Sequence, residues 1–186
     1  MEPIPSFFDQ FSSAVKEIIS AQCQLETYKE GEYLHPANKT LKRLFWVKKG
    51  VVRIGSINEK GVDLTHYFYD EEHLVAIVQS FDEEIPTEAF IQASCDAEIY
   101  SVTREVLLDL YQQFPVIRQA INGEIKRHMI EKINVRNQYL GLEAEEKYRH
   151  FLNSQPGIAK RVPLRHIAEY LGITPQSLSR IRRQIR

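Results

Sequence analysis

The sequence predicts an α+β protein in which an N-terminal β jelly roll leads into a long dimerisation helix and then a small α-helical helix-turn-helix domain. Three observations support this fold class. Short β-type runs separated by turn residues fill residues 24–102, a long proline-free stretch follows with apolar side chains at helical spacing, and two short helical patterns joined by a glycine lie near the C-terminal end. We therefore expect three parts, at residues 1–115, 116–142 and 143–186.

Composition places the chain among ordinary folded proteins. Hydrophobic residues make up 43% and charged residues 26% of the 186 positions, which argues against a disordered or fibrous chain. No apolar run approaches the ~18 residues needed to cross a bilayer, and residues 1–20 form a Phe-rich amphipathic stretch unlike a signal peptide. We expect a cytoplasmic protein with no membrane partner.

Cysteine content limits the metal chemistry that one chain could support. Cys23 and Cys95 are the two cysteines of the sequence and are far apart in it. They cannot form a thiolate zinc site or a four-cysteine iron-sulfur cluster within one chain. We expect idle thiols in a reducing compartment, and neither a metal nor a cofactor.

Charge is divided unevenly along the chain. The net charge is −1, but within residues 159–186 seven basic residues oppose Glu169 alone, a balance of +6 that leaves −7 for the remainder. An acidic body with a basic end is typical of a phosphate-binding module attached to a domain that does not bind phosphate. The alternative is a solvated basic tail.

Turn and capping residues divide the first part into elements. Ser6 is a candidate cap for a first helix whose apolar face is Phe8, Phe11, Val15, Ile18 and Ile19. Residues 48–50 and 58–61 each end in glycine between apolar runs and predict two hairpins, because glycine readily adopts positive φ. A short helix is expected from Thr103, and Phe114-Pro115 interrupts it before the next helix begins.

The long helix predicted over residues 116–142 carries one apolar stripe. Its members are Ile117, Ile121, Ile125, Met129 and Ile133. A solitary helix of this length is marginal in water, so the stripe needs a partner, and the same helix of a second subunit supplies one. We therefore predict a parallel homodimer. Burial of the stripe against the chain's own barrel is the alternative.

Residues 164–181 predict two crossing helices with a sharp turn at Gly172. A small core is expected between them, made by Ile167, Ala168, Leu171, Ile173, Leu178 and Ile181. Thr174 can cap the second helix, and Pro175 occupies its first position, where a missing N–H costs nothing.

The outward face of the second helix is predicted to carry polar side chains that suit contacts with DNA. Gln176 has the paired donor and acceptor suited to adenine, Arg180 has the fork suited to guanine, and Ser177 can reach base edges. Phosphate contacts are expected from Lys160, Arg161, Thr174, Ser179, Arg182, Arg183 and Arg186. A helical hairpin that only packs is the alternative.

The whole chain resembles the Crp/Fnr family of bacterial transcription regulators. The resemblance rests on residues 29–34 and 45–54 of the predicted barrel and on residues 167–181 of the predicted motif, in the same order. It implies a cyclic-nucleotide-binding-like sensor domain, a dimerisation helix and a second helix that reads the major groove. Double-stranded DNA and a second copy are the implied partners. RNA polymerase and an unidentified small-molecule effector are further candidates.

Two departures limit what the resemblance implies. Family members that bind cyclic AMP use a Gly-Glu pair and an Arg-Ser or Arg-Thr pair, whereas the corresponding places here are Ala76-Ile77 and Thr87-Glu88. A carboxylate repels phosphate, so we treat these four residues as a degenerate effector pocket and do not expect cyclic AMP. After Ile185-Arg186 we expect little room for a β-wing.

Two other function classes compete with this interpretation. A jelly roll can host a metal-dependent enzyme, and His35, His66 and His73 lie in the barrel region, but His66 and His73 are seven residues apart with a turn between them, unlike a cupin motif. We expect no enzymatic activity. A sensor that binds a ligand or protein through the barrel without reading DNA is the second class, and the +6 end argues against it.

Overall fold

Two antiparallel four-stranded sheets form the first part of the molecule in the computed structural model, which describes residues 5–185. The first sheet has the order β1-β10-β4-β7, with bounds Gln24–Tyr28, Ala97–Thr103, Arg43–Lys49 and Leu74–Val75. The second has the order β2-β9-β5-β6, with bounds Tyr33–His35, Ala89–Ala93, Val52–Ile57 and Asp63–Tyr69. A two-stranded ribbon adds β3 (Lys39–Thr40) and β8 (Pro86–Thr87).

The two sheets enclose the larger core of the protein. Residues of β4 are buried almost without interruption, and the indole of Trp46 packs against the ring of Phe8 at 5.1 Å between centroids. Alternation of buried and exposed residues is therefore replaced in β4 by a continuous apolar run, as expected for a strand covered on both faces. The predicted α+β jelly roll with a long helix and small helical domain is confirmed.

The two turn predictions have different outcomes. Residues 58–61 join β5 to β6, which pair in one sheet, so this hairpin is confirmed. The hairpin at residues 48–50 is wrong, because β4 pairs with β10 and β7 whereas β5 pairs with β6 and β9. Gly50 has φ of +99° at this crossing between sheets, and a Cβ there would meet the carbonyl oxygen of Asp96 at 2.5 Å.

The N-terminal segment folds as two helices instead of the one expected. A 3-10 helix η1 (Ser6–Gln10) precedes α1 (Ser13–Gln22), and the chain is extended between them. Ser12, not Ser6, caps α1, because its hydroxyl accepts the backbone N–H of Val15. The Phe8 and Phe11 side chains are still buried as the apolar pattern predicts.

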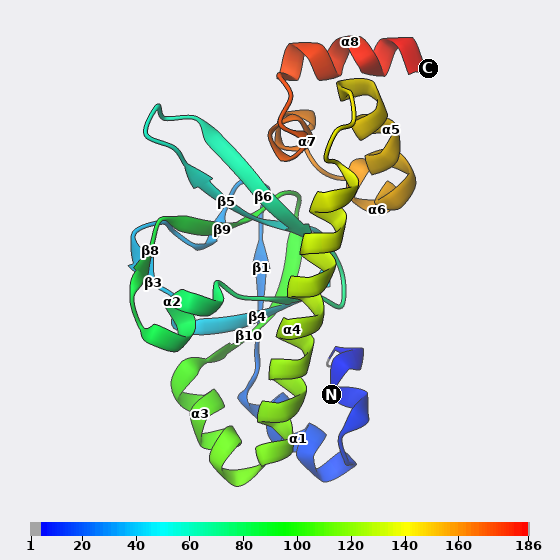
Figure 1. The fold of residues 1–186 in the computed structure, drawn as a ribbon. Coiled ribbons are helices and arrows are strands. Elements are labelled where there is room, and N and C mark those ends of the chain that lie inside the picture. Colours follow the sequence, from blue (N-terminus) through cyan, green and yellow to red (C-terminus); the bar gives the residue numbers. More distant parts are fainter. Residues whose placement is uncertain (1–4, 186) are drawn as a thin grey trace.

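Helices α2 (Val78–Glu83) and α3 (Arg104–Gln113) lead to the long helix α4 (Pro115–Gln138), which runs along the barrel in Figure 1. The short helix expected from Thr103 is α3, and the hydroxyl of Thr103 caps it by accepting the N–H of Val106. The apolar stripe of α4 is divided between two environments. Ile117 and Ile121 are 1% exposed in the chain's own core, whereas three apolar side chains farther along are more than half exposed, namely Met129 (53%), Ile130 (51%) and Ile133 (58%).

Within the described residues, four helices follow α4 and pack together at one end of the molecule (Figure 1). They are α5 (Ala144–Ser154), α6 (Pro156–Ala159), α7 (Leu164–Leu171) and α8 (Pro175–Ile185). Their core includes two barrel side chains, Val51 and Phe68, so the last part of the chain rests on the sheet. Within residues 5–185 no helix is both long enough and apolar enough to cross a membrane.

Candidate nucleic-acid interface

Local sequence explains how α7 and α8 are joined. Gly172 ends α7 in the left-handed region at φ of +68°, and its N–H donates to the carbonyl oxygen of Glu169. The hydroxyl of Thr174 then accepts the N–H of Ser177 at 3.1 Å, which is the predicted cap of α8. The predicted core between the helices is also confirmed, since Ile167, Ala168, Leu171, Leu178 and Ile181 are buried and Ile173 is half-buried.

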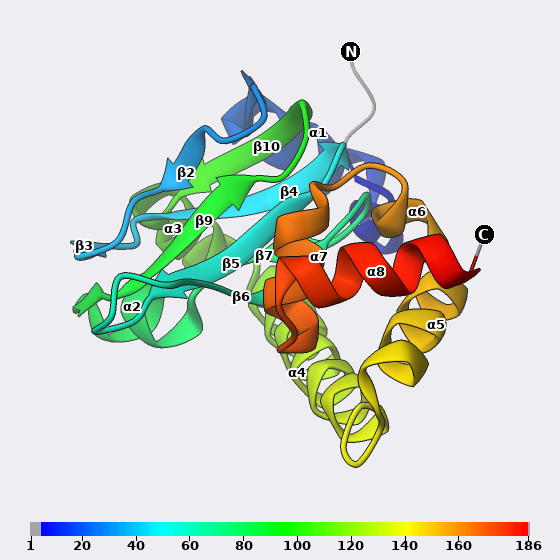
Figure 2. The same ribbon diagram turned by 90° about the horizontal axis from the view of Figure 1, so that it is seen from above.

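The outward face of α8 is the surface on which the predicted base-reading side chains lie. Gln176 and Arg180 are exposed, and Ser177 and Ser179 are half-buried. The hydroxyl of Thr174 donates to that of Ser177 at 3.0 Å, so these two side chains also fix one another. Figure 2, seen from above, shows α8 with no other helix or strand of the described residues drawn over it.

The basic side chains near α8 fall into two groups. Arg182 and Arg183 are exposed, as is Lys160, and in residues 5–185 no carboxylate lies within ion-pair distance of these three or of Arg180. Arg161, by contrast, forms a bidentate pair with Glu71 of the barrel, and the longer of its two contacts is 3.0 Å. Arg161 therefore already has a structural partner, and Arg186 lies outside the described residues.

A buried arginine links the barrel to the helix-turn-helix. The side chain of Arg53 on β5 is 1% exposed, and its guanidinium donates to Asp63 at 2.9 and 2.6 Å and to Gln92 at 2.9 and 2.7 Å. The same group reaches Glu169 of α7 at 3.2 Å, and the hydroxyl of Thr65 donates to that carboxylate at 2.8 Å. Burial raises the pKa of Glu169, although the Thr65 hydrogen bond opposes the shift.

His166 lies beside this network. Its side chain is buried, and Nδ1 has no hydrogen-bond partner in residues 5–185, while Nε2 accepts from Arg165 at 3.2 Å. Burial, reinforced by the charges of Arg53 and Arg165, lowers the pKa of His166 to about 4. The imidazole is therefore neutral near pH 7.

The predicted effector-pocket residues are not gathered around one cavity. Ala76 lines a cavity of about 20 Å³ between the barrel and α4, which holds about one water molecule. Ile77 precedes α2, Thr87 lies in β8 paired with Lys39, and Glu88 is exposed beside it. A cavity for a drug-sized or nucleotide-sized ligand has about 300 Å³ or more, so this place is closed to such a ligand in the structure.

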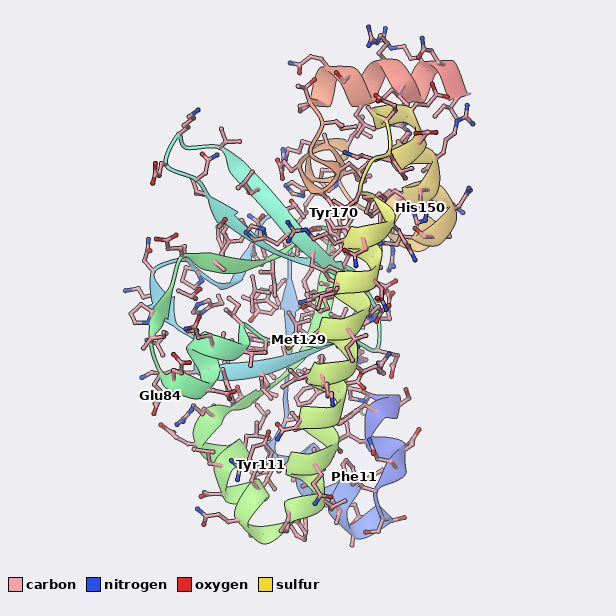
Figure 3. All side chains as sticks on the ribbon, viewed as in Figure 1. Phe11, Glu84, Tyr111, Met129, His150 and Tyr170 are labelled. Carbon is pink, nitrogen blue, oxygen red and sulfur yellow. The ribbon has the colours of Figure 1, made fainter. Side chains whose placement is uncertain are left out.

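A larger cleft, of about 480 Å³, lies where the barrel, α4 and α7 meet. Tyrosine rings and basic groups line it, among them Tyr67, Lys132, Arg136, Tyr139 and Tyr170. Figure 3 labels Tyr170 and His150 on the two sides of the C-terminal end of α4, and both rings contact Tyr139, at 6.0 and 5.1 Å between centroids. The sequence did not indicate this cleft, because its members come from four elements, β5, β6, α4 and α7, which occupy separate parts of the chain.

The three histidines of the predicted barrel, which a metal-dependent enzyme would need as ligands, lie on different elements. His35 is buried on β2, His66 contacts the hydroxyl of Ser56 at 2.8 Å, and His73 lies in the turn before β7. Among residues 5–185, no group with metal-ligand spacing contains two of these three histidines. Burial raises the pKa of Cys23 to about 11, consistent with an unreactive thiol.

Comparison with known proteins points to regulators. A sequence model of the cyclic nucleotide-binding domain matches residues 25–114, which span most of the two sheets. The fumarate and nitrate reduction regulatory protein of Vibrio cholerae serotype O1 is 27% identical, over 82% of this chain and 64% of that protein. The chain thus spans less than two thirds of the length of this curated relative.

Solved structures share the fold. FixK2 from Bradyrhizobium japonicum aligns with a TM-score of 0.75 at 16% identity, over 88% of this chain and 84% of that one. A transcriptional regulator described as Crp/Fnr type from Eubacterium rectale aligns with a TM-score of 0.75 at 18% identity, over 96% of this chain and 85% of that one. The c-di-GMP-responsive global regulator CLP from Xanthomonas campestris aligns with a TM-score of 0.73 at 15% identity, over 94% of this chain and 91% of that one.

Proposed function

We propose that this chain is a transcription regulator of the Crp/Fnr type, which binds specific double-stranded DNA through α8 as a homodimer. The observation that carries the proposal is the outward face of α8. It presents Gln176 and Arg180 to solvent, and basic side chains flank it without acidic partners in the described residues. Base edges and phosphates of DNA can accept hydrogen bonds from these groups, for which the described residues supply no acidic partner.

Roles within the interface follow from side-chain chemistry. Arg180 can donate two parallel hydrogen bonds to guanine, and Gln176 can pair with adenine through its amide. Ser177 lies between them and can reach base edges. Backbone phosphates are assigned to exposed or half-buried polar groups around the helix, namely Lys160, Thr174, Ser179, Arg182 and Arg183. Arg161 would join them only after leaving Glu71.

The exposed half of the α4 stripe supports the homodimer. Met129, Ile130 and Ile133 lie on the C-terminal half of the helix, and each is more than half exposed. Burial of such a patch against its copy would remove apolar surface from water. The first half of the stripe is already buried, so the subunit contact is proposed for the second half only. Two α8 helices about 34 Å apart would then meet successive major grooves of a near-palindromic site.

A titration against duplex DNA at two salt concentrations tests this function. Phosphate contacts predict a steep fall in affinity as salt rises, and selection from a random duplex pool should yield one near-palindromic sequence. Protein that shows no preference for any duplex, even at low ionic strength, would favour the alternative, a sensor that uses the barrel without reading DNA. The same selection with and without cell metabolites addresses an effector.

A further inference from the structure

His73 and His128 bring two imidazoles together across the boundary between the barrel and α4. Their ring centroids are 5.0 Å apart, although 55 residues separate them in sequence. His128 is buried on the helix, and His73 is half-buried in the turn that precedes β7. Glu131 lies one helical turn after His128, on the same side of α4.

One nitrogen of each imidazole is already held by a carboxylate. Nδ1 of His73 lies 3.0 Å from Oδ1 of Asp70, and Nε2 of His128 lies 3.0 Å from Oε1 of Glu124. Nε2 of His128 is also 2.9 Å from the guanidinium of Arg127, which can only donate. A metal on Nδ1 would place the ring proton on Nε2, so the Arg127 contact would be replaced by the hydrogen bond that Nε2–H donates to Glu124. The nitrogens left over are Nε2 of His73 and Nδ1 of His128. A carboxylate behind each ligating histidine is the arrangement that orients imidazoles toward metal ions in proteins.

We infer that His73, His128 and Glu131 form a binding site for a divalent first-row transition metal ion such as zinc. Each residue offers one ligand atom, and the three atoms lie within 4.8 Å of one another. Imidazole nitrogen and carboxylate oxygen are ligands that such ions prefer. Tetrahedral zinc with bonds of about 2.0 Å places its donors about 3.3 Å apart, so small side-chain rotations would close the site around the ion.

Charges around the site permit a divalent cation. Asp70, Glu71, Glu124 and Glu131 contribute four carboxylates, and the opposing charges are the guanidinium groups of Arg127 and Arg161 and the ammonium of Lys132. The Lys132 ammonium lies over the rings of Tyr67 and Tyr69, at 4.9 and 4.6 Å from their centroids. The bound ion would join the turn after β6 to α4, and so fix the barrel against the helix proposed to form the dimer.

Metal titration of the purified full chain tests the inference. After dialysis against a chelator, Co²⁺ is added as a visible-absorbing probe, and Zn²⁺ is then added as competitor. We expect one Co²⁺ per chain, displaced by Zn²⁺. His73→Gln should weaken binding about 100-fold through loss of a ligand, and Asp70→Asn about 10-fold through loss of the orienting carboxylate. His66→Gln, on an exposed histidine outside the cluster, should bind as the unaltered chain does.

Two outcomes would overturn the inference. One is the absence of saturable Co²⁺ binding by the unaltered chain, and the other is unchanged affinity in His73→Gln. Because His73 and Asp70 are only half-buried, circular dichroism should show both variants folded, and Glu131→Gln gives a second ligand variant that should also lose affinity. The measurement involves no DNA, so its failure leaves the proposed DNA binding standing, and failure of DNA binding leaves this site standing.

Discussion

Arg53 and Glu169 face one another across the boundary between the barrel and the helix-turn-helix, 116 residues apart in sequence and 3.2 Å apart in space. The guanidinium also donates hydrogen bonds to Asp63 and Gln92 within the barrel, and these hold its position. Thr65 donates to the same carboxylate. This pair therefore sets how α7, and with it α8, lies relative to the barrel.

Glu169→Gln should lower the free energy of unfolding by about 1–2 kcal/mol, because a charge-assisted hydrogen bond to a buried guanidinium is replaced by a neutral one. Urea denaturation measures the change. Glu145→Gln is the matched control, since Glu145 pairs with Arg149 on an exposed surface and its loss should cost about 0.5 kcal/mol or less. Equal stabilities of the two variants would mean that the contact across the boundary contributes nothing.

Arg180→Ala should cost about 1–3 kcal/mol of binding to the selected duplex and relax the preference at one base pair of each half-site. Arg182→Ala should instead weaken all duplexes alike and reduce the salt slope by about 1. Fluorescence anisotropy against matched and mismatched duplexes separates the two effects. Arg149→Ala removes the same charge from α5, where Arg149 already pairs with Glu145, and is the control. A uniform loss in Arg180→Ala would make Arg180 a phosphate contact.

Ile133→Glu should weaken the dimer by about 2 kcal/mol or more, because a charge would be placed in the exposed apolar patch of α4 that is proposed to meet its copy. Sedimentation equilibrium measures the association. Val116→Glu alters a similarly exposed apolar residue (51%) at the other end of the helix and should leave the dimer intact. Equal effects of both variants, or a monomeric unaltered chain, would contradict the proposed interface.

Two glycine substitutions should change stability in opposite directions. Gly172→Ala should destabilise by about 1 kcal/mol, because Gly172 has φ of +68°, where a side chain is strained. Gly123→Ala should stabilise by about 0.5–1 kcal/mol, because Gly123 lies within α4 and nothing stands within 4 Å of the added Cβ. Thermal and urea unfolding measure both. A destabilised Gly123→Ala would indicate a close contact at that face of α4.

His166 should make stability fall as pH drops below about 6.5. Its pKa is lowered to about 4 in the folded chain, so the unfolded chain binds more protons between these values, and stability present above pH 6.5 is lost toward pH 4. The loss is up to about 3 kcal/mol. Arg53, Arg165 and Asp63 face the ring, and the two arginines deepen the shift. Urea unfolding of His166→Gln should show a smaller difference between pH 7 and pH 4.5 than the unaltered chain does.

Local signals in the sequence predicted much of the fold and of the α8 surface. The cap at Thr174, the turn at Gly172 and the hairpin over residues 58–61 each depend on residues within one short segment. The turn at residues 48–50 was wrong because a glycine marks a change of direction without indicating whether the next strand stays in the same sheet.

Contacts between distant segments were not predictable from one sequence. Apolar residues recur along α4 at the same helical spacing throughout. Ile121 is nevertheless buried and Ile133 exposed, because the barrel covers only part of the helix. Arg53 resembled an ordinary strand residue, and nothing in the sequence indicated that it meets Glu169. The pairing of His73 with His128 was missed for the same reason.

Val51 and Phe68 belong to the barrel by sequence but are buried among the side chains of the final helices. If the chain were cut before α5, Phe68 would be exposed to solvent on one fragment, and the rings of Phe151 and Tyr170 would be exposed on the other. Each fragment would then have an exposed apolar patch that favours aggregation. Calorimetry of the intact chain should therefore show a single unfolding transition, because unfolding of either part would expose apolar side chains of the other to water.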